Sequence, residues 1–507
     1  MRMKITMVLM CCLLAAACEA RLELGSPFSD GAVLQREMPV PVWGWAKPGS
    51  KIVVAFAGHE ATTIADGSGR WQVVLPAMKA SAESRTLRVS GDGELAVKDV
   101  LVGEVWFVSG QSNCEFPLVG YNPHNTDEDG GMTAQLTHKP DIRFLKAALY
   151  QTATKPCERT AKPVEWKKFL PENLSVPGGF SAVGVYFALE LYEHIRIPVG
   201  LVGVYWGATC IEPWIPSSGF ASIPEFQAES RWLVKDKKTF EATGGLKPLV
   251  PTIDDYHNTV NQQPAAIWNA LVAPLAPYAM RGLVWYQGCS NKKSPERYCK
   301  MMHALYNGWA KEFGLAKMKL YYAQLAPYSD DWPALWEQQA QFEREQPNAA
   351  MAIINDVGCT SDIHPNRKRP VGRRLAVHAL KRDYGLDIVD NSPTLKSWKL
   401  DGNRFVLSFN DVKSWGAYNA DWSIWTGFEI AGADGKFRPA RIENLAGGAK
   451  KTVAWKTKGD IKGRDLVVVA DDVAEPKTLR YLYARPWKGC LFNEVSLPLG
   501  AFKIEVR

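Results

Sequence analysis

The chain has 507 residues, of which 46% are hydrophobic and 22% charged, and its formal net charge is +7 at pH 7. This length exceeds a usual single core, so two or three domains are expected, and the composition excludes wholesale disorder. The positive charges are scattered, with no dense basic run carrying interleaved aromatic residues, which argues against a nucleic-acid partner.

The first twenty residues have the pattern of a secretory signal peptide. Arg2 and Lys4 precede the apolar run Ile5 to Ala17, and small residues follow. We therefore expect an exported, periplasmic or extracellular protein whose signal peptide spans residues 1–20. The stretch around Cys18 also resembles a lipoprotein cleavage box, so a lipid anchor through Cys18 is an alternative. No later stretch is long and apolar enough to span a bilayer.

Residues 21–100 are expected to form an N-terminal β-sandwich domain. Short apolar or alternating runs, such as Val40 to Trp45 and Lys51 to Phe56, are separated by Gly and Pro turns. Trp43 and Trp45 alternate along one such run, which favours core positions over a sugar-stacking role.

Residues 101–397 alternate between strand and helix patterns, which indicates an α/β sheet. Apolar residues recur at helical spacing from Phe180 to Ile195, and Pro198 follows, so a helix is expected to end there. The expected strands include Val105–Val108, Leu201–Tyr205, Leu283–Tyr286, Leu320–Leu325 and Met351–Ile354.

Two stretches of this region, 119–177 and 217–264, are polar and irregular and predict loop insertions over the ligand-binding edge. Residues 398–507 return to β-like runs and predict a C-terminal β domain. Trp415, Trp422 and Trp425 lie in that domain, where core packing is favoured over a carbohydrate platform.

The turn from Ser109 to Asn113 presents Ser112 as a candidate nucleophile. It follows a buried strand, and Gly110 permits the backbone angles of a tight reversal. Ligands bind open α/β sheets at the carboxyl ends of their strands, so a site is expected here. Three further blocks could share that edge: Gly203–Thr209, Trp285–Asn291 and Asp362–Pro365.

These four ordered blocks resemble those of the sialate O-acetylesterase family of SGNH-type esterases. The family reads Gly-Gln-Ser-Asn, Trp-Gly-Gly-Thr, Trp-Tyr-Gln-Gly-Glu-Ser-Asn and Asp-Ile-His-Pro at the corresponding places. The resemblance extends to Phe28–Arg36 and Gly427–Gly435. It implies an SGNH-hydrolase-like parallel sheet flanked by helices, with β-sandwich regions at both ends, and no cofactor.

The resemblance further implies a serine esterase that removes O-acetyl groups from carbohydrate, in the first place O-acetylated sialic acid. Acetylated xylan or another polysaccharide is an alternative substrate. A glycan-binding protein that has lost activity and a structural surface protein are alternatives from other classes. Oligomeric state is left open.

Ester hydrolysis needs a nucleophile with a neighbouring base, because a serine hydroxyl stays protonated at neutral pH. His364 suits the role of base, since imidazole titrates near working pH. Asp362 is our choice for the acid that orients His364, with Asp356 as the competitor. Candidate oxyanion donors are the N–H groups of Ser112 and Gly207 and a side-chain amide of Gln287 or Asn291.

Seven cysteines follow the leader, and none forms a CxxC pair, so no metal site is expected. Two of them depart from the family pattern: Cys289 replaces a Glu, and Cys114 replaces a Met. Loss of the Glu removes hydrogen bonds that could support the third block. A disulfide between Cys289 and Cys359 is one compensation, and buried free thiols are the alternative.

Overall fold

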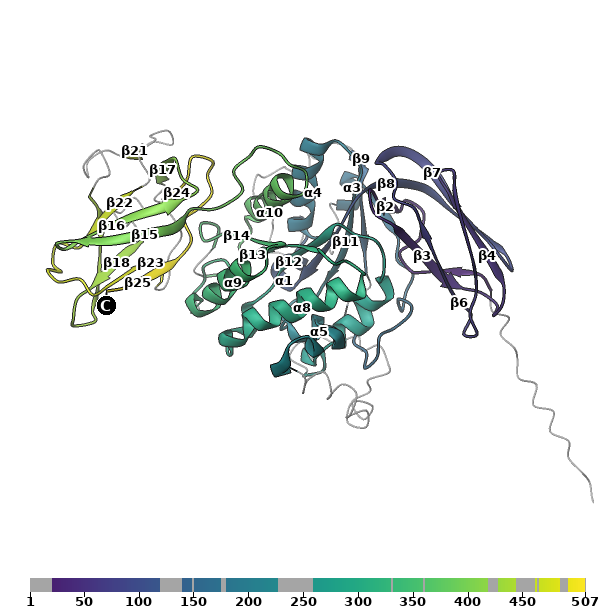
Figure 1. Ribbon diagram of the computed structural model, residues 1–507, viewed down its shortest axis with the longest axis horizontal. Helices are drawn as coiled ribbons and strands as arrows, with labels where there is room; N and C mark the ends of the chain where they lie inside the picture. Colours follow the sequence, from purple (N-terminus) through teal and green to yellow (C-terminus); the bar gives the residue numbers. More distant parts are fainter. Residues whose placement is uncertain are drawn as a thin grey trace, which may run out of the picture.

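The computed structural model describes residues 21–118, 139–147, 150–174, 179–226, 259–329, 332–358, 361–417, 427–443, 461–462, 465–483 and 491–506. These residues form three regions in a row, in which a central α/β region lies between two β regions (Figure 1).

The N-terminal region consists of two layers of strands, as expected. One sheet contains β1 (Glu23–Leu24), β3 (Val40–Trp45) and β6 (Arg70–Leu75). The other contains β2 (Val33–Gln35), β4 (Lys51–Phe56), β5 (His59–Ile64), β7 (Ser81–Ser90) and the first half of β8 (Glu94–Gly110). Trp43 and Trp45 are 1% and 8% exposed, so the prediction that they belong to the core is confirmed.

β8 continues without a break from the N-terminal region into the central sheet, so the predicted boundary at residue 100 falls inside a strand. The order of the central sheet is β10 (Trp166–Phe169), β9 (Lys139–Lys146), β11 (Val199–Tyr205), β8, β12 (Gly282–Tyr286), β13 (Lys319–Ala323) and β14 (Ala349–Ala352). All neighbours are parallel except β10 and β9. The carboxyl ends of these parallel strands therefore meet at one edge.

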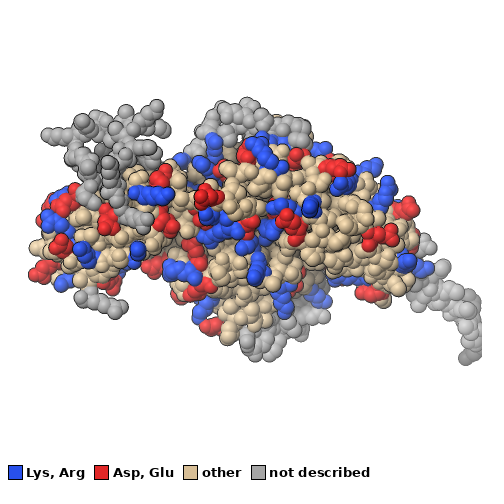
Figure 2. All heavy atoms as spheres, turned by 45° about the horizontal axis from the view of Figure 1, so that its top comes forward, with Lys and Arg blue, Asp and Glu red and all other residues tan. Residues whose placement is uncertain are grey.

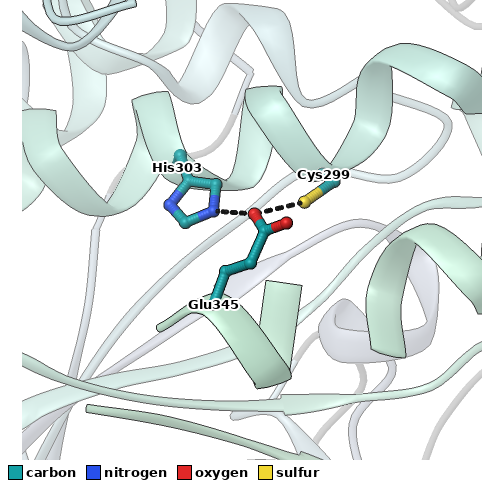
Figure 3. Close-up of side chains that lie close together, drawn as sticks. All are labelled: Cys299, His303 and Glu345. Carbon is teal, nitrogen blue, oxygen red and sulfur yellow. Dashed lines mark hydrogen bonds and ion pairs between the residues drawn. The ribbon is translucent and has the colours of Figure 1, made fainter. Parts of the chain in front are cut away.

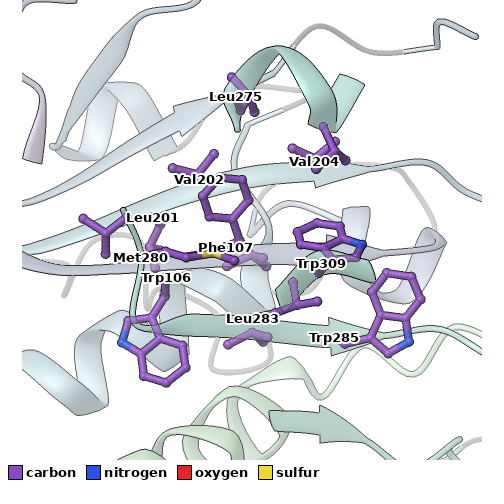
Figure 4. Packing of buried hydrophobic residues seen from close by; sticks show 14 of the residues in the cluster. Trp106, Phe107, Leu201, Val202, Val204, Leu275, Met280, Leu283, Trp285 and Trp309 are labelled. Carbon is purple, nitrogen blue, oxygen red and sulfur yellow. The ribbon is translucent and has the colours of Figure 1, made fainter. Parts of the chain in front are cut away.

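Successive residues of β8 pack helices against opposite faces of the sheet. The Trp106 ring contacts Phe187 of α4 (Ala182–Ile195), and the Phe107 ring contacts Trp309 of α8 (Tyr298–Glu312). Figure 4 shows Trp106 and Phe107 pointing to opposite sides of their strand. α10 (Lys368–Arg382) packs closely on α4, because Gly372 has no side chain. A Cβ atom at this position would lie 2.6 Å from the Val183 carbonyl oxygen.

α9 (Pro333–Glu345) lies beside α8, and three side chains join the two helices (Figure 3). Glu345 accepts hydrogen bonds from Cys299 and His303, at 3.4 and 2.9 Å. The helix predicted over 180–195 begins at Ala182, where the Ser181 hydroxyl accepts from the Gly184 N–H and caps it.

The prediction of an irregular insertion over 119–177 is wrong in part, because β9, β10 and the short helix α3 (Pro171–Leu174) lie there. The buried Arg143 in β9 obscured the strand pattern, and it is paired with Asp99 at 3.0 Å. In the second predicted insertion, α5 (Ser217–Ala221) and short turns at Pro224–Phe226 and Thr259–Gln262 are described, and residues 227–258 lie outside the described part.

The C-terminal region is built from short antiparallel strands around its own core, as expected. Its sheets contain β15 (Thr394–Asp401), β16 (Arg404–Asn410), β22 (Leu466–Val469) and β20 (Arg441–Ile442); β21 (Ile461–Lys462), β17 (Ser414–Ala417) and β24 (Leu491–Phe492); and β19 (Phe437–Pro439), β18 (Phe428–Ala431), β23 (Thr478–Tyr481) and β25 (Phe502–Glu505). Trp415 is buried in this core, and Trp422 and Trp425 lie outside the described residues.

Charged side chains of both signs are intermixed over the face shown in Figure 2. This agrees with the scattered charge of the sequence. Within the described residues, no helix combines the length and the apolar character that crossing a membrane requires.

Candidate active site

Ser112 begins a four-residue helix, α1 (Ser112–Glu115), at the carboxyl end of β8. Gly110 is in register with Tyr205 of β11 and Tyr286 of β12, so the three strands end at one level. A Cβ atom on Gly110 would lie 2.2 Å from the Tyr286 carbonyl oxygen, and its φ is +143°. Only glycine fits at this place, and the turn that presents Ser112 depends on it.

His364 lies in the loop between β14 and α10, where its Nε2 is 2.9 Å from the Ser112 Oγ. The Phe116 ring meets the imidazole edge to face, with centroids 4.7 Å apart. Residues 252 positions apart in the sequence are thus brought within hydrogen-bond distance, in the geometry that a nucleophile and its base require.

The two candidate acids have different surroundings. Asp362 Oδ1 lies 3.6 Å from the His364 Nδ1 and accepts a 2.8 Å hydrogen bond from the His364 N–H. Asp356 is held by the Arg374 guanidinium through two hydrogen bonds, of 2.6 and 2.8 Å. The geometry therefore favours Asp362 for contact with the imidazole, and Asp356 for a structural ion pair.

The Gly207 N–H, a predicted oxyanion donor, is engaged by a carboxylate. It donates to the Glu115 Oε2 at 2.6 Å, and the Tyr150 hydroxyl donates to the other oxygen of Glu115, also at 2.6 Å. Burial raises the pKa of the Glu115 carboxyl above its ordinary value, against the effect of these hydrogen bonds and of Lys146 nearby.

The two predicted side-chain amides hold loops together in this structure. The Gln287 Nε2 donates to the Thr209 carbonyl oxygen at 3.0 Å and to the Asn291 Oδ1 at 2.8 Å. The Asn291 Nδ2 donates to the Glu212 carboxylate at 2.9 Å. Both amides are buried, and they join the ends of β11 and β12.

The Ser112 N–H differs from these donors, because no described residue accepts a hydrogen bond from it. The first N–H groups of a helix have no partner within the helix, so this one is available to a ligand. The role of all four groups as oxyanion donors stays a prediction.

The loop that carries Cys289 is supported without the Glu of the family pattern. The Tyr298 hydroxyl lies 2.9 Å from both the carbonyl oxygen and the Oε1 of Gln287, and the Gly288 N–H donates to the Gln111 Oε1. Cys114, Cys157, Cys210 and Cys299 form no disulfide. Cys359 lies outside the described residues, so the Cys289–Cys359 disulfide stays a prediction.

Sequence reasoning missed two buried charged residues at the site, Glu115 and Lys368. Glu115 follows Ser112 by one helical turn, a spacing that could have drawn attention to it. Lys368 stands between Arg367 and Arg369, and nothing in such a basic run marks which member is buried.

One described group of side chains has the chemistry of metal ligands, and it lies outside this site. The ligand atoms of Cys299, His303 and Glu345 are within 4.8 Å of one another. Because the three groups satisfy one another by hydrogen bonding, they need no ion, and we assign them to the contact between α8 and α9.

Comparison with known proteins agrees with the arrangement of the four blocks. The family described as carbohydrate esterase, sialic acid-specific acetylesterase, matches residues 102–381. The chain belongs to this family. The resemblance seen in the four blocks is therefore confirmed, and the chain is a carbohydrate O-acetylesterase.

Several relatives of this esterase carry more specific names. It is 28% identical to the sialate O-acetylesterase of Mus musculus over 401 residues, which cover 70% of this chain and 72% of the relative. It is 29% identical to the Homo sapiens protein of the same name, over 71% of each chain.

Among solved structures, a carbohydrate acetylesterase from Xanthomonas citri shares 32% identity with a TM-score of 0.76, covering 96% of this chain and all of that one. The predicted fold class, a helix-flanked sheet with β regions at both ends, is confirmed by this likeness.

Proposed function

We propose that this carbohydrate O-acetylesterase works through Ser112 as nucleophile and His364 as general base. The observation that supports this most directly is the 2.9 Å separation between the Ser112 Oγ and the His364 Nε2. Both side chains lie at the carboxyl edge of the parallel strands, where open α/β sheets bind their ligands.

The reaction then proceeds in two steps. The Ser112 Oγ attacks the acetyl carbonyl carbon while its proton passes to the His364 Nε2. Collapse of the tetrahedral intermediate breaks the ester bond, and the departing sugar oxygen takes the proton from His364. Water, deprotonated by His364, then attacks the acetyl-Ser112 carbonyl. The bond between the acetyl carbon and the Ser112 Oγ breaks, His364 returns the proton to that oxygen, and acetate leaves.

Asp362 is proposed to orient His364, on the strength of its contact with the imidazole Nδ1 side. For the developing oxyanion we propose the Ser112 N–H, together with the Gly207 N–H once the substrate oxygen replaces Glu115 as its acceptor. Gln287 and Asn291 are proposed to hold the surrounding loops, because their amide nitrogens donate to acceptors that follow β11.

The proposed substrate is O-acetylated sialic acid. The family description and the names of the mammalian relatives support it. Acetylated xylan is the competing substrate.

The test is acetate release from O-acetylated sialic acid and from acetylated xylan, measured side by side. Ser112→Ala is expected to abolish release from the preferred substrate. Ser109→Ala is the matched control, because the Ser109 hydroxyl is buried on β8, the strand that precedes Ser112, with no partner among the described residues. Preference for xylan would reject the sialate assignment, and full activity of Ser112→Ala would reject the mechanism.

We also propose that the protein is exported, on the pattern of residues 1–20. Mass spectrometry of protein from the native compartment is expected to find Arg21 at the amino terminus. A chain that begins with acylated Cys18 would indicate the lipid anchor instead, and a chain that keeps Met1 would reject export.

A further inference from the structure

Lys368 is a buried lysine beside the proposed catalytic pair. It is the first residue of α10, four positions after His364, and its side chain is fully shielded from solvent. Burial lowers the pKa of its amine from 10.5 to about 7. Burying a lysine costs free energy, so we expect Lys368 to have a role at this place, and its contacts indicate which one.

The Lys368 Nζ donates a hydrogen bond to the Asn113 Oδ1. It also lies over the ring faces of Phe116 and Tyr286, 5.9 and 5.7 Å from their centroids. Ring faces attract a cation but offer no strong hydrogen bond. The Asn113 oxygen is therefore the specific partner of this amine among the described residues.

The bond to Lys368 fixes which way the Asn113 amide points. An ammonium group has no acceptor, so it must face the Asn113 oxygen and leaves the Asn113 nitrogen turned the other way. That nitrogen donates to the Ile363 carbonyl oxygen at 3.0 Å. Asn113 directly follows Ser112, and Ile363 directly precedes His364, so the amide joins the two backbone segments that carry the pair.

Phe116 forms a second connection between the same parts. Its ring lies under the Lys368 amine and meets the His364 imidazole edge to face. Lys368 thus contacts two side chains, Asn113 and Phe116, that each contact the loop of His364.

We propose that Lys368 is a positioning residue for the hydrolysis described under Proposed function, on which this inference rests. Through Asn113 it holds the His364 loop at the distance from Ser112 at which the Nε2 can take the hydroxyl proton. It does not touch the reacting atoms.

The titratable groups that face the amine are Cys114 from α1, Tyr286 from β12, Cys289 from the following loop and Asp362 from the loop before α10. Burial raises the pKa of the Cys114 thiol to about 12, so this thiol stays neutral at working pH. Both the ammonium and the amine form of Lys368 can donate to Asn113, and in either form the Ile363 carbonyl oxygen, which only accepts, keeps the Asn113 nitrogen turned away from Lys368. The positioning role therefore predicts the same loss on substitution at pH 6 and at pH 8.5.

The test is a double-mutant cycle on the full chain, with a small aryl acetate as substrate. Lys368→Met removes the donor and Asn113→Ala removes its acceptor. Each is expected to lower kcat by about 10²-fold, as a displacement of about 1 Å does in an active site, with KM within about threefold. Because the two residues act as one unit, the double variant is expected to lose no more than the worse single variant.

Lys381→Met is the matched control, because Lys381 lies on the same helix with an exposed side chain. The proposal would be overturned if the kcat losses of the two single variants multiplied in the double variant. A change confined to KM, or a kcat loss seen only at pH 6, would also overturn it. If Lys368→Met does not fold, Lys368→Gln, which keeps a donor, is expected to retain kcat within about tenfold; a loss as deep as that of Asn113→Ala would overturn the proposal.

Ser112→Ala separates this inference from the function on which it rests. If Ser112→Ala is inactive and Lys368→Met is fully active, only the role of Lys368 fails. If Ser112→Ala is active, the proposed mechanism itself fails.

Discussion

Gly110 is the residue on which the geometry of the nucleophile depends. A methyl group at this position would collide with the Tyr286 backbone, and φ of +143° is strained for any L side chain. Gly110→Ala is expected to destabilise the fold by on the order of 3 kcal/mol and to abolish turnover. Urea unfolding measures the first effect. Gly67→Ala, at a glycine with open space around it, should change stability by less than about 0.5 kcal/mol.

Single substitutions distinguish Asp362 from Asp356 as the acid that orients His364. Asp362→Asn is expected to lower kcat by roughly 10²-fold or more, because an amide cannot stabilise the imidazolium that forms. Asp356→Asn weakens the pair with Arg374, so it should lower the melting temperature and leave kcat within about tenfold. Steady-state kinetics beside thermal melts distinguish the two variants, and the reverse ranking of kcat would make Asp356 the orienting acid.

At the scale of elements, β8 carries a buried acid where it passes from the N-terminal sheet into the central sheet. Glu104 is fully buried, accepts hydrogen bonds of 2.9 and 3.0 Å from Arg281, and pairs with Arg36 beyond β2. Although burial raises the pKa of Glu104, the two guanidinium groups bring it below the ordinary value of 4.5. The ion pairs therefore join three parts of the chain at one carboxylate.

Glu104→Gln is expected to cost about 3–5 kcal/mol at pH 7, because it leaves two arginines short of their partner. A carboxylate with a lowered pKa stabilises the fold above pH 4.5, and this contribution is lost as the pH falls through the pKa of the folded state. Denaturation at pH 7 and pH 4 should show wild type losing more stability on acidification than Glu104→Gln. Equal losses would mean that Glu104 is not linked to the acid sensitivity.

At the scale of the whole molecule, the C-terminal β region contacts the segment that leads to His364. The buried Asn355 side chain donates to the Leu499 carbonyl oxygen at 2.7 Å, and the Arg374 guanidinium reaches the Ser496 carbonyl oxygen at 3.4 Å. Arg374 is also the partner of Asp356. The C-terminal region therefore supports the loop between β14 and α10 from outside the central sheet.

Asn355→Ala is expected to lower stability by about 1 kcal/mol, the net value of one hydrogen bond, and to loosen the attachment of the C-terminal region. Limited proteolysis should cut the variant faster than wild type in the segment around residue 393. Asn410→Ala, on the exposed side of β16, serves as control. Cleavage rates equal to those of wild type would show that this bond does not hold the two regions together.

The sequence by itself indicated the order of the three regions, the strands that precede the four blocks, and Ser112 and His364 as the candidate pair. Each of these follows from a local pattern in the sequence: apolar runs, a glycine turn, and residue types with one evident chemistry. Trp43 and Trp45 were placed in the core for the same reason, since alternation along a strand is a local property.

Only the tertiary structure decided which partners these residues have. The Gly207 N–H donates to Glu115, the amides of Gln287 and Asn291 donate to acceptors in loops, and Asp356 pairs with Arg374. The same is true of Lys368 and Asn113, which lie 255 positions apart. Hydrogen-bond donors are satisfied by whatever the fold brings within about 3 Å, and that neighbourhood is set by strand register and helix packing, which no local pattern records.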